Sequence, residues 1–137
     1  MQNNITFSMV KPEIIKAGNL GEIITQIEQN GFRIKALKLT QLSIEDAKKF
    51  YAIHQARPFY QDLCAYMASG PIVAMVLEKD DAVASFRKLI GATNPVEALP
   101  GTIRKRFGKS IEENAIHGSD ADSNASIEAK FFFPDLY

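Results

Sequence analysis

The alternation of apolar and polar residues near the start of the chain predicts a β-strand. Residues 5–9, ITFSM, place every second, apolar side chain on one face, so that face would lie on a core. Lys11 continues the apolar face, and Pro12 ends the ladder of backbone hydrogen bonds. The lysine is therefore placed either to reach into a cleft beyond the strand or to lie along the sheet edge with its ammonium in water.

Apolar residues at helical spacing predict two amphipathic helices. One covers residues 20–27 and ends at Asn30-Gly31, and the other covers residues 81–90, where Arg87 borders the buried stripe. Residues 72–78, IVAMVLE, are almost continuously apolar and predict a central strand buried on both faces. The other predicted elements are a strand at about 32–42, a helix capped by Ser43 that runs through Tyr51, a helical segment from Pro58 to about Ser69, and a last helix capped by Ser123 or Asn124 that runs through Ala129.

A long segment with little periodicity, residues 91–114, lies between the helix at 81–90 and a short apolar step at 115–117. A segment of this length without regular structure is usually functional in a compact domain. The order strand, helix, strand, helices, strand, helix, strand predicts an α+β fold of the ferredoxin-like, split βαβ kind. We expect one domain over residues 1–137, with a four-stranded antiparallel sheet covered by helices on one face and a long functional loop at about 91–114.

The composition limits the kinds of partner that the chain can have. Its 137 residues suffice for a core, and its 16 basic and 16 acidic residues give no net charge, so no overall field attracts nucleic acid or an anionic membrane. Cys64 is the single cysteine, which excludes an intrachain disulfide. The first residues have no leader pattern, and no apolar run is long enough to span a bilayer. We therefore expect a cytoplasmic protein with no membrane partner and no dedicated nucleic-acid partner.

Two features of the sequence could carry chemistry. His117, in ENAIHGSD, follows an apolar stretch and precedes a turn; its imidazole can act as a nucleophile and proton carrier near neutral pH, or be a turn residue only. Residues 104–109 hold four cations, which are typical of a phosphate clamp, a solvated face or, least of the three, a nucleic-acid patch. The tail Gly108-Lys109-Ser110 resembles a P-loop, but Ile103 stands where that motif needs glycine.

Five segments agree in order and spacing with one enzyme family. They are MVKP, RPFYQDLCAYMASGP, GATNP, PGTIR and ENAIHGSD, and on them the chain closely resembles a nucleoside diphosphate kinase. The resemblance implies transfer of the γ-phosphoryl group from a nucleoside triphosphate to a nucleoside diphosphate by a ping-pong mechanism. It also implies broad base specificity, a role in balancing nucleotide pools, and a phosphohistidine intermediate on His117.

The resemblance assigns further roles to residues around His117. Tyr51 and Glu128 would hold the imidazole, and Ser119 would accompany the glutamate. A carboxylate bonded to the ring nitrogen opposite the nucleophilic one would fix the tautomer. The residues implied in nucleotide binding are Arg87, Thr93 and Arg104 for the phosphates, Lys11 and Asn114 for the sugar, with Lys11 also near the transferred phosphate, and Phe59 and Ile111 for the two faces of the base.

The family also implies a cofactor and an assembly. Mg2+ would bridge the substrate phosphates without a dedicated protein cage, and the chain would form a homo-oligomer, a tetramer or a hexamer. His54 matches no catalytic position of the family and is expected on a helix surface. Lys105 and Arg106 replace a small residue and an aspartate that the family usually has, so they would steer triphosphates to the site, contact a neighbouring subunit or form a solvated face.

Two other classes of protein are possible for such a chain. A nucleotide-binding or DNA-binding module without catalysis would keep the pocket, but it would not need a histidine together with the groups that orient it. A ferredoxin-like RNA-binding domain would carry stacking aromatic residues on its central strands, and residues 72–78 have none. We therefore expect an enzyme.

Overall fold

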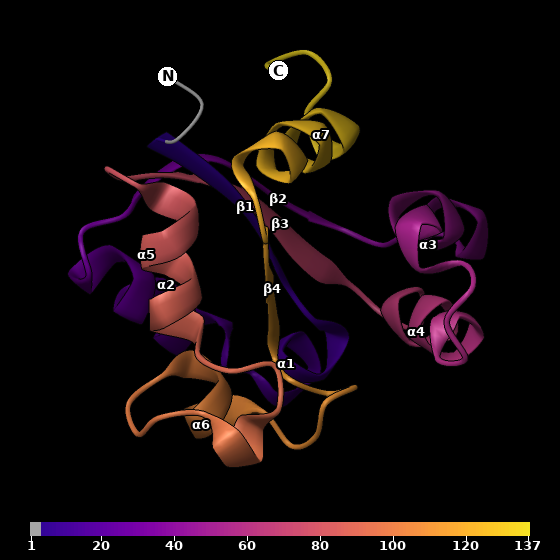
Figure 1. The fold of residues 1–137 in the computed structure, drawn as a ribbon, viewed down its shortest axis with the longest axis horizontal. Coiled ribbons are helices and arrows are strands. Elements are labelled where there is room, and N and C mark those ends of the chain that lie inside the picture. The colour runs from indigo at the N-terminus through magenta and orange to yellow at the C-terminus, as the bar shows by residue number, and fades with distance from the viewer. Residues whose placement is uncertain (1–3) are drawn as a thin grey trace.

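Four strands form one antiparallel sheet in the computed structural model, which describes residues 4–137. Their order across the sheet is β2-β3-β1-β4, and Figure 1 shows how the helices surround them. The elements, in chain order, are β1 (Ile5–Val10), α1 (Pro12–Ala17), α2 (Leu20–Gln29), β2 (Arg33–Thr40), α3 (Ile44–Phe50), the 3₁₀-helix η2 (Ala52–His54), α4 (Tyr60–Met67), β3 (Ile72–Glu78), α5 (Ala82–Ile90), the 3₁₀-helix η3 (Pro95–Glu97), α6 (Ile103–Phe107), β4 (Ile116–Gly118) and α7 (Asp122–Phe132).

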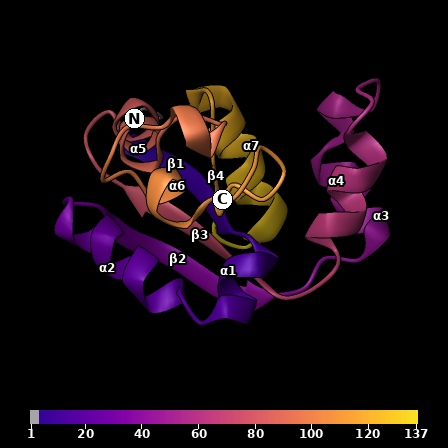
Figure 2. The ribbon, with the colours of Figure 1, turned by 90° about the horizontal axis from the view of Figure 1, so that it is seen from below.

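Helices cover both faces of the sheet, so the expectation of helices on one face only is wrong. Helices α1, α2, α5 and α6 pack on the face that holds Val73, Met75 and Leu77 of β3, and α3, α4 and α7 pack on the face of Ala74 and Val76. Side chains of a strand alternate between its faces, and β3 is apolar at nearly every position, so it has a core on either side. Figure 2 shows α2 and α7 on opposite sides of the strands.

The first strand is buried on both faces as well, although its alternation predicted only one core face. Thr6 and Ser8 are fully buried. The reason is the position of β1, which pairs with β3 on one side and β4 on the other, while α5 packs against it. The end of this inner strand carries Lys11, which is consequently buried rather than left at a sheet edge.

The structure contains a helix that the sequence did not predict, and the last helix has other bounds than expected. A short helix, α1, follows β1 directly, because Pro12 suits the first helical position and Gly18, with φ of 80°, ends the helix in the left-handed region. The last helix begins at Asp122, with no side-chain cap, so capping by Ser123 or Asn124 is wrong. This helix continues to Phe132, whose ring is buried in the core.

The segment 91–114 contains two short helices and is therefore less irregular than its sequence suggests. Asn94 begins η3 by accepting a hydrogen bond from the N–H of Val96 at 3.1 Å. Thr102 begins α6 by accepting one from the N–H of Lys105 at 3.3 Å. Asparagine and threonine are preferred helix caps, so these starts had a local signal that apolar periodicity does not report.

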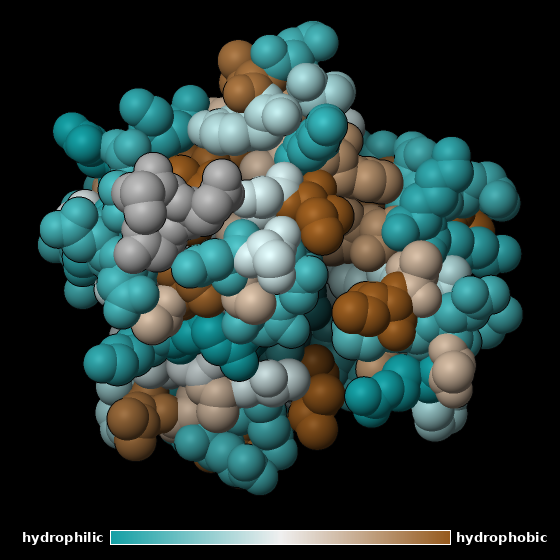
Figure 3. Space-filling view, turned by 45° about the horizontal axis from the view of Figure 1, so that its top comes forward, coloured by the Kyte–Doolittle hydropathy of each residue, from teal (hydrophilic) through white to brown (hydrophobic). Residues whose placement is uncertain are grey.

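The helices α3 and α4 form a lobe beside the sheet, at the right of Figure 1. The Tyr60 hydroxyl of α4 donates to the carbonyl of Lys48 in α3 at 3.1 Å, which joins the two helices. Figure 3 shows a hollow between this lobe and the rest of the molecule.

Candidate active site

His117 lies on the edge strand β4, opposite Met9 of β1. The next residue, Gly118, turns its Cα hydrogens toward the opposite side of the sheet, where α5 leaves no room for a side chain. A Cβ atom at Gly118 would lie 2.9 Å from Ile90 Cδ1 and 3.0 Å from the Phe86 ring. Because Gly118 has no side chain, α5 packs closely against one side of β4. The imidazole of His117 lies on the other side and faces α7.

One carboxylate oxygen binds both the imidazole and a neighbouring hydroxyl. His117 Nε2 is 2.9 Å from Glu128 Oε1, and the Ser119 hydroxyl donates to the same oxygen at 2.7 Å. The Ser119 hydroxyl also accepts a hydrogen bond from the backbone N–H of Phe7 at 3.2 Å, so it is anchored to β1. A carboxylate at Nε2 keeps the proton on that nitrogen, which leaves the lone pair of Nδ1 available.

Aromatic rings pack against the imidazole. The ring centroid of Phe7 lies 6.1 Å from that of His117, and Phe50 lies edge-on at 5.8 Å. Tyr51 is buried and contacts Phe50 edge-on at 5.0 Å. Burial, and then the charge of Glu128, raise the pKa of the Tyr51 phenol, so it stays neutral. Phe50 contacts both rings, and the role of Tyr51 in holding the imidazole stays a prediction.

Three cations lie close to the strand that carries the histidine. Arg104 is 8% exposed and donates to the carbonyls of Gly91 at 3.0 Å and Ile116 at 2.8 Å. Burial, and then the charge of Arg87, lower the pKa of Arg104 to about 10. Burial, and then Arg104, lower the pKa of Lys11 to about 8. Arg104 and Lys11 are held out of water beside one another, and Arg87 is exposed nearby. An anion would stabilise these charges, so the cluster suits phosphate groups.

The other residues expected to bind nucleotide lie on several segments. Asn114 is 3% exposed and donates through its amide to the Thr93 carbonyl at 3.0 Å, while its Oδ1 atom is buried without a partner. Phe59 and Ile111 are 42% and 53% exposed. Phe59 belongs to the lobe, and Ile111 belongs to the segment before β4, which points toward the lobe in Figure 1. Their apolar faces are therefore free to contact a ligand.

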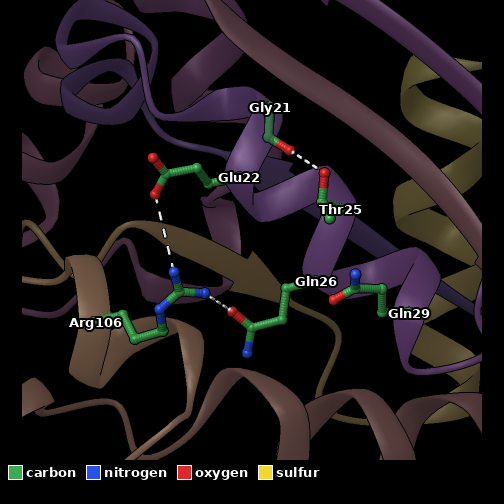
Figure 4. Close-up of a pocket in the computed structure, with 6 residues that line it drawn as sticks. All are labelled: Gly21, Glu22, Thr25, Gln26, Gln29 and Arg106. Atoms are coloured by element: carbon green, nitrogen blue, oxygen red, sulfur yellow. Dashed lines mark hydrogen bonds and ion pairs between the residues drawn. The ribbon is translucent and has the colours of Figure 1, made fainter.

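The remaining cations of α6 contact the surface of their own chain. Arg106 donates to Gln26 Oε1 of α2 and lies 3.9 Å from the Glu22 carboxylate, as Figure 4 shows. Lys105 donates to a backbone carbonyl of η3 at 3.2 Å. Arg104 thus points inward and Arg106 outward. The steering and assembly roles of Lys105 and Arg106 stay predictions. The surface pocket of about 570 Å3 in Figure 4 is lined by Gly21, Glu22, Thr25, Gln26, Gln29 and Arg106.

Sequence reasoning missed two residues at this site. Phe50 packs on the imidazole, and Glu13 accepts a hydrogen bond from the N–H of Ala115 at 3.0 Å, two positions before the histidine. Phe50 directly precedes Tyr51, and Glu13 follows the segment MVKP. Their proximity to the motifs was visible in the sequence, but their contacts depend on the fold.

Comparisons with known proteins show which family the chain resembles over nearly its whole length. The family model described as nucleoside diphosphate kinase matches residues 4–136. The nucleoside diphosphate kinase of Flavobacterium psychrophilum is 56% identical over 97% of this chain and 96% of its own length, and that of Campylobacter fetus is 57% identical over 93% of both. A crystal form of the Aquifex aeolicus nucleoside diphosphate kinase has a TM-score of 0.95 at 43% identity, covering 97% of this chain and 96% of that one. A nucleoside diphosphate kinase from Halobacterium salinarum, in complex with CDP, has a TM-score of 0.93 at 38% identity, covering 98% and 90%.

The fold, the histidine beside buried cations and these matches together define a phosphotransferase that acts on nucleotides. The chain belongs to the nucleoside diphosphate kinase family. Its activity is the transfer of the terminal phosphoryl group of a nucleoside triphosphate to a nucleoside diphosphate. The resemblance and the α+β fold class predicted from the sequence are confirmed.

Proposed function

We propose that His117 carries the phosphoryl group between two nucleotides on its Nδ1 atom. The hydrogen bond of 2.9 Å between His117 Nε2 and Glu128 Oε1 is the observation that carries this proposal. It commits Nε2 to holding a proton, so Nδ1 is the nitrogen that can attack. Ser119 keeps Glu128 in place, and Tyr51 supports the imidazole from behind Phe50.

Each half-reaction exchanges one bond to phosphorus for another. In the first, the Nδ1 lone pair attacks the γ-phosphorus, the N–P bond forms, and the bond to the β,γ-bridging oxygen breaks, so a nucleoside diphosphate leaves. The ring gains positive charge, which the Glu128 carboxylate stabilises through Nε2–H. In the second, a β-phosphate oxygen of another diphosphate attacks the same phosphorus, and the electron pair of the N–P bond returns to Nδ1. This sequence gives ping-pong kinetics.

The cations near His117 stabilise the charge that spreads over the transferred phosphoryl oxygens. Arg104 is held in place by the carbonyls of Gly91 and Ile116, so it does not need to reorganise when phosphate binds. Arg87 is exposed and contacts the phosphates from α5, with the Thr93 hydroxyl as a further donor. Lys11 adds a charge at the end of β1, near the transferred group.

The nucleoside is held by groups that do not distinguish one base from another. Phe59 and Ile111 contact the two faces of the base, and stacking tolerates every base because each has a π-face. Lys11 and Asn114 bind the sugar hydroxyls. The buried Oδ1 of Asn114, which has no hydrogen-bond partner, supports this role because a sugar hydroxyl can donate to it.

Mg2+ would be held in the site mainly by the substrate phosphates. In residues 4–137 no group of three histidine, cysteine, aspartate or glutamate side chains is placed to hold a metal ion. When bound, Mg2+ would neutralise part of the triphosphate charge, with ligands supplied mainly by the substrate and water. The chain's own cations complement that neutralisation.

We also propose that residues 1–137 form one kinase domain and that the domain forms a homo-oligomer, a tetramer or a hexamer. The edge strand β2 supports assembly, because Leu37 and Leu39 are 44% and 64% exposed beside unpaired backbone groups. Among residues 4–137, no helix combines the length and the apolar character needed to cross a membrane. The cytoplasmic location stays a prediction.

The proposed function is tested by isolating the covalent intermediate. The protein is mixed with a Mg2+-bound nucleoside triphosphate, freed of nucleotide and measured by intact-mass spectrometry. We expect the mass of one phosphoryl group, lost again on addition of any common nucleoside diphosphate. His117→Ala should not gain this mass, whereas His54→Ala, which removes the only other histidine, should behave as the unaltered protein does. Labelling of His117→Ala at the normal rate contradicts the proposal.

A further inference from the structure

A strained turn leads into the strand that carries His117. The N–H of Ile116 donates to the carbonyl of Asn114 at 3.0 Å, which closes a three-residue γ-turn around Ala115. Ala115 has φ of 78°, in the left-handed region that residues with a Cβ atom avoid. It is fully buried, so neighbouring groups must hold this conformation.

The N–H and the carbonyl of Ala115 both form hydrogen bonds with residues at the start of α1. Its N–H donates to Glu13 Oε2 at 3.0 Å, across 102 positions of sequence, and its carbonyl accepts from the N–H of Lys11 at 2.9 Å. The carbonyl of Ile116 accepts from Arg104 Nη2 at 2.8 Å. The turn is thus fixed from outside, and Glu13 is the side chain that binds its centre.

Glu13 is a partly buried acid that phosphoryl transfer does not use directly. Its Oε1 atom is buried without a hydrogen-bond partner. Burial raises the pKa of Glu13, and the nearby charge of Glu113 acts in the same direction, while the N–H of Ala115 and the charge of Lys11 act in the opposite direction. An acidic residue in the first turn of a helix often serves the helix alone. The Glu13 carboxylate instead accepts a hydrogen bond from the turn at Ala115, so stabilising α1 is not its only role.

We propose that Glu13 is a positioning residue for the nucleophile. By holding the Ala115 N–H, it fixes the γ-turn and so sets where β4 begins, which places His117 two residues later against the phosphate-binding cations. The inference rests on the proposed role of His117. A small displacement of a reacting atom slows a reaction strongly, so loss of this hydrogen bond should slow phosphorylation of His117 rather than weaken nucleotide binding.

The test measures the single-turnover rate of His117 phosphorylation by a Mg2+-bound nucleoside triphosphate, together with the dissociation constant of the diphosphate. Glu13→Ala should slow the chemical step by about tenfold to a hundredfold. Glu13→Gln, whose amide oxygen can still accept from Ala115, should stay within about threefold of the unaltered protein. Glu112→Ala is the matched control, because the Glu112 carboxylate also raises the pKa of Lys11. Glu112 is exposed, so this substitution should leave the phosphorylation rate within about twofold.

A second substitution distinguishes positioning from a general loss of folding. Glycine adopts positive φ without steric cost, so Ala115→Gly in the Glu13→Ala background should recover part of the lost rate. The inference is overturned if Glu13→Ala lowers the thermal midpoint but leaves the rate of the folded protein unchanged, or if Glu13→Gln is as slow as Glu13→Ala. If the unaltered protein gains no phosphoryl group on His117, the proposed function fails instead.

Discussion

The buried charge of Lys11 should lower the free energy of unfolding, and the size of this effect can be measured. The side chain is 7% exposed, and burial, followed by the charge of Arg104, lowers its pKa from 10.5 to about 8. At about 1.4 kcal/mol for each pH unit, this difference corresponds to about 3 kcal/mol. Below pH 8 the lysine is charged in both the folded and the unfolded chain, so the folded state bears this cost in full. Between pH 8 and 10.5 the folded protein has lost the proton that the unfolded chain retains, so the Lys11 contribution to stability increases with pH.

Replacement of Lys11 by methionine removes the charge and keeps most of the apolar stem. At pH 7 and constant protein concentration, we expect Lys11→Met to raise the free energy of unfolding by up to about 3 kcal/mol. The difference from the unaltered protein should shrink toward zero by pH 10.5. The same variant should lose kcat/KM, because a neutral side chain no longer attracts phosphate. The stabilisation and the loss of activity would then have one cause.

Urea unfolding at several pH values is the assay, and Lys16→Met is the matched control. Lys16 is an exposed lysine of α1, the helix that follows Lys11 directly, so its replacement should change stability by less than about 0.5 kcal/mol at every pH. If Lys11→Met is no more stable than the unaltered protein at pH 7, the buried ammonium does not oppose folding and the reasoning is refuted. A gain that does not vary with pH would likewise exclude a charge effect.

Three further substitutions test other parts of the site. Gly118→Ala would place a Cβ atom 2.9 Å from Ile90, so it should destabilise the fold by about 1–3 kcal/mol in thermal unfolding, and an unchanged midpoint would contradict the close packing of α5. Ser119→Ala removes the hydroxyl that donates to Glu128 at 2.7 Å; it should cost about 1–3 kcal/mol of stability and slow phosphorylation, whereas a variant with normal stability and rate would show that the hydroxyl orients nothing. Arg104→Ala should lower kcat/KM for purine and pyrimidine substrates alike by about 2–4 kcal/mol of transition-state stabilisation, and a loss confined to one base would contradict its role at the phosphates.

The sequence predicted the fold best where one pattern of apolar residues dominates. The continuous run at 72–78 and the helical stripe at 81–90 became β3 and α5 with nearly the expected boundaries. Thr6 and Ser8 misled the prediction for β1, because polarity reports solvent exposure only when no helix covers that face. The short helices α1 and α6 have too few residues for periodicity to detect, and their starts depend on Pro12 and Thr102.

In the candidate site, too, contacts between residues close in sequence could be predicted, and contacts between distant residues could not. The motif containing His117 was readable, and Glu128 lies only 11 positions further along, so one helix brings them together. The bond between Glu13 and Ala115 spans 102 positions, and no spacing rule anticipates it. Burial is likewise a property of the folded chain, so the lowered pKa of Lys11 could not be predicted from its neighbours in sequence.

The ring position of the phosphoryl group tests the central claim most directly. Phosphorylated protein with isotope-labelled histidine can be examined by NMR, which distinguishes the two nitrogens of each imidazole. Because Glu128 occupies Nε2 at 2.9 Å, we predict one phosphoryl group on Nδ1 of His117 and none on His54. A phosphoryl group on Nε2 of His117, or on any other residue, would contradict the account.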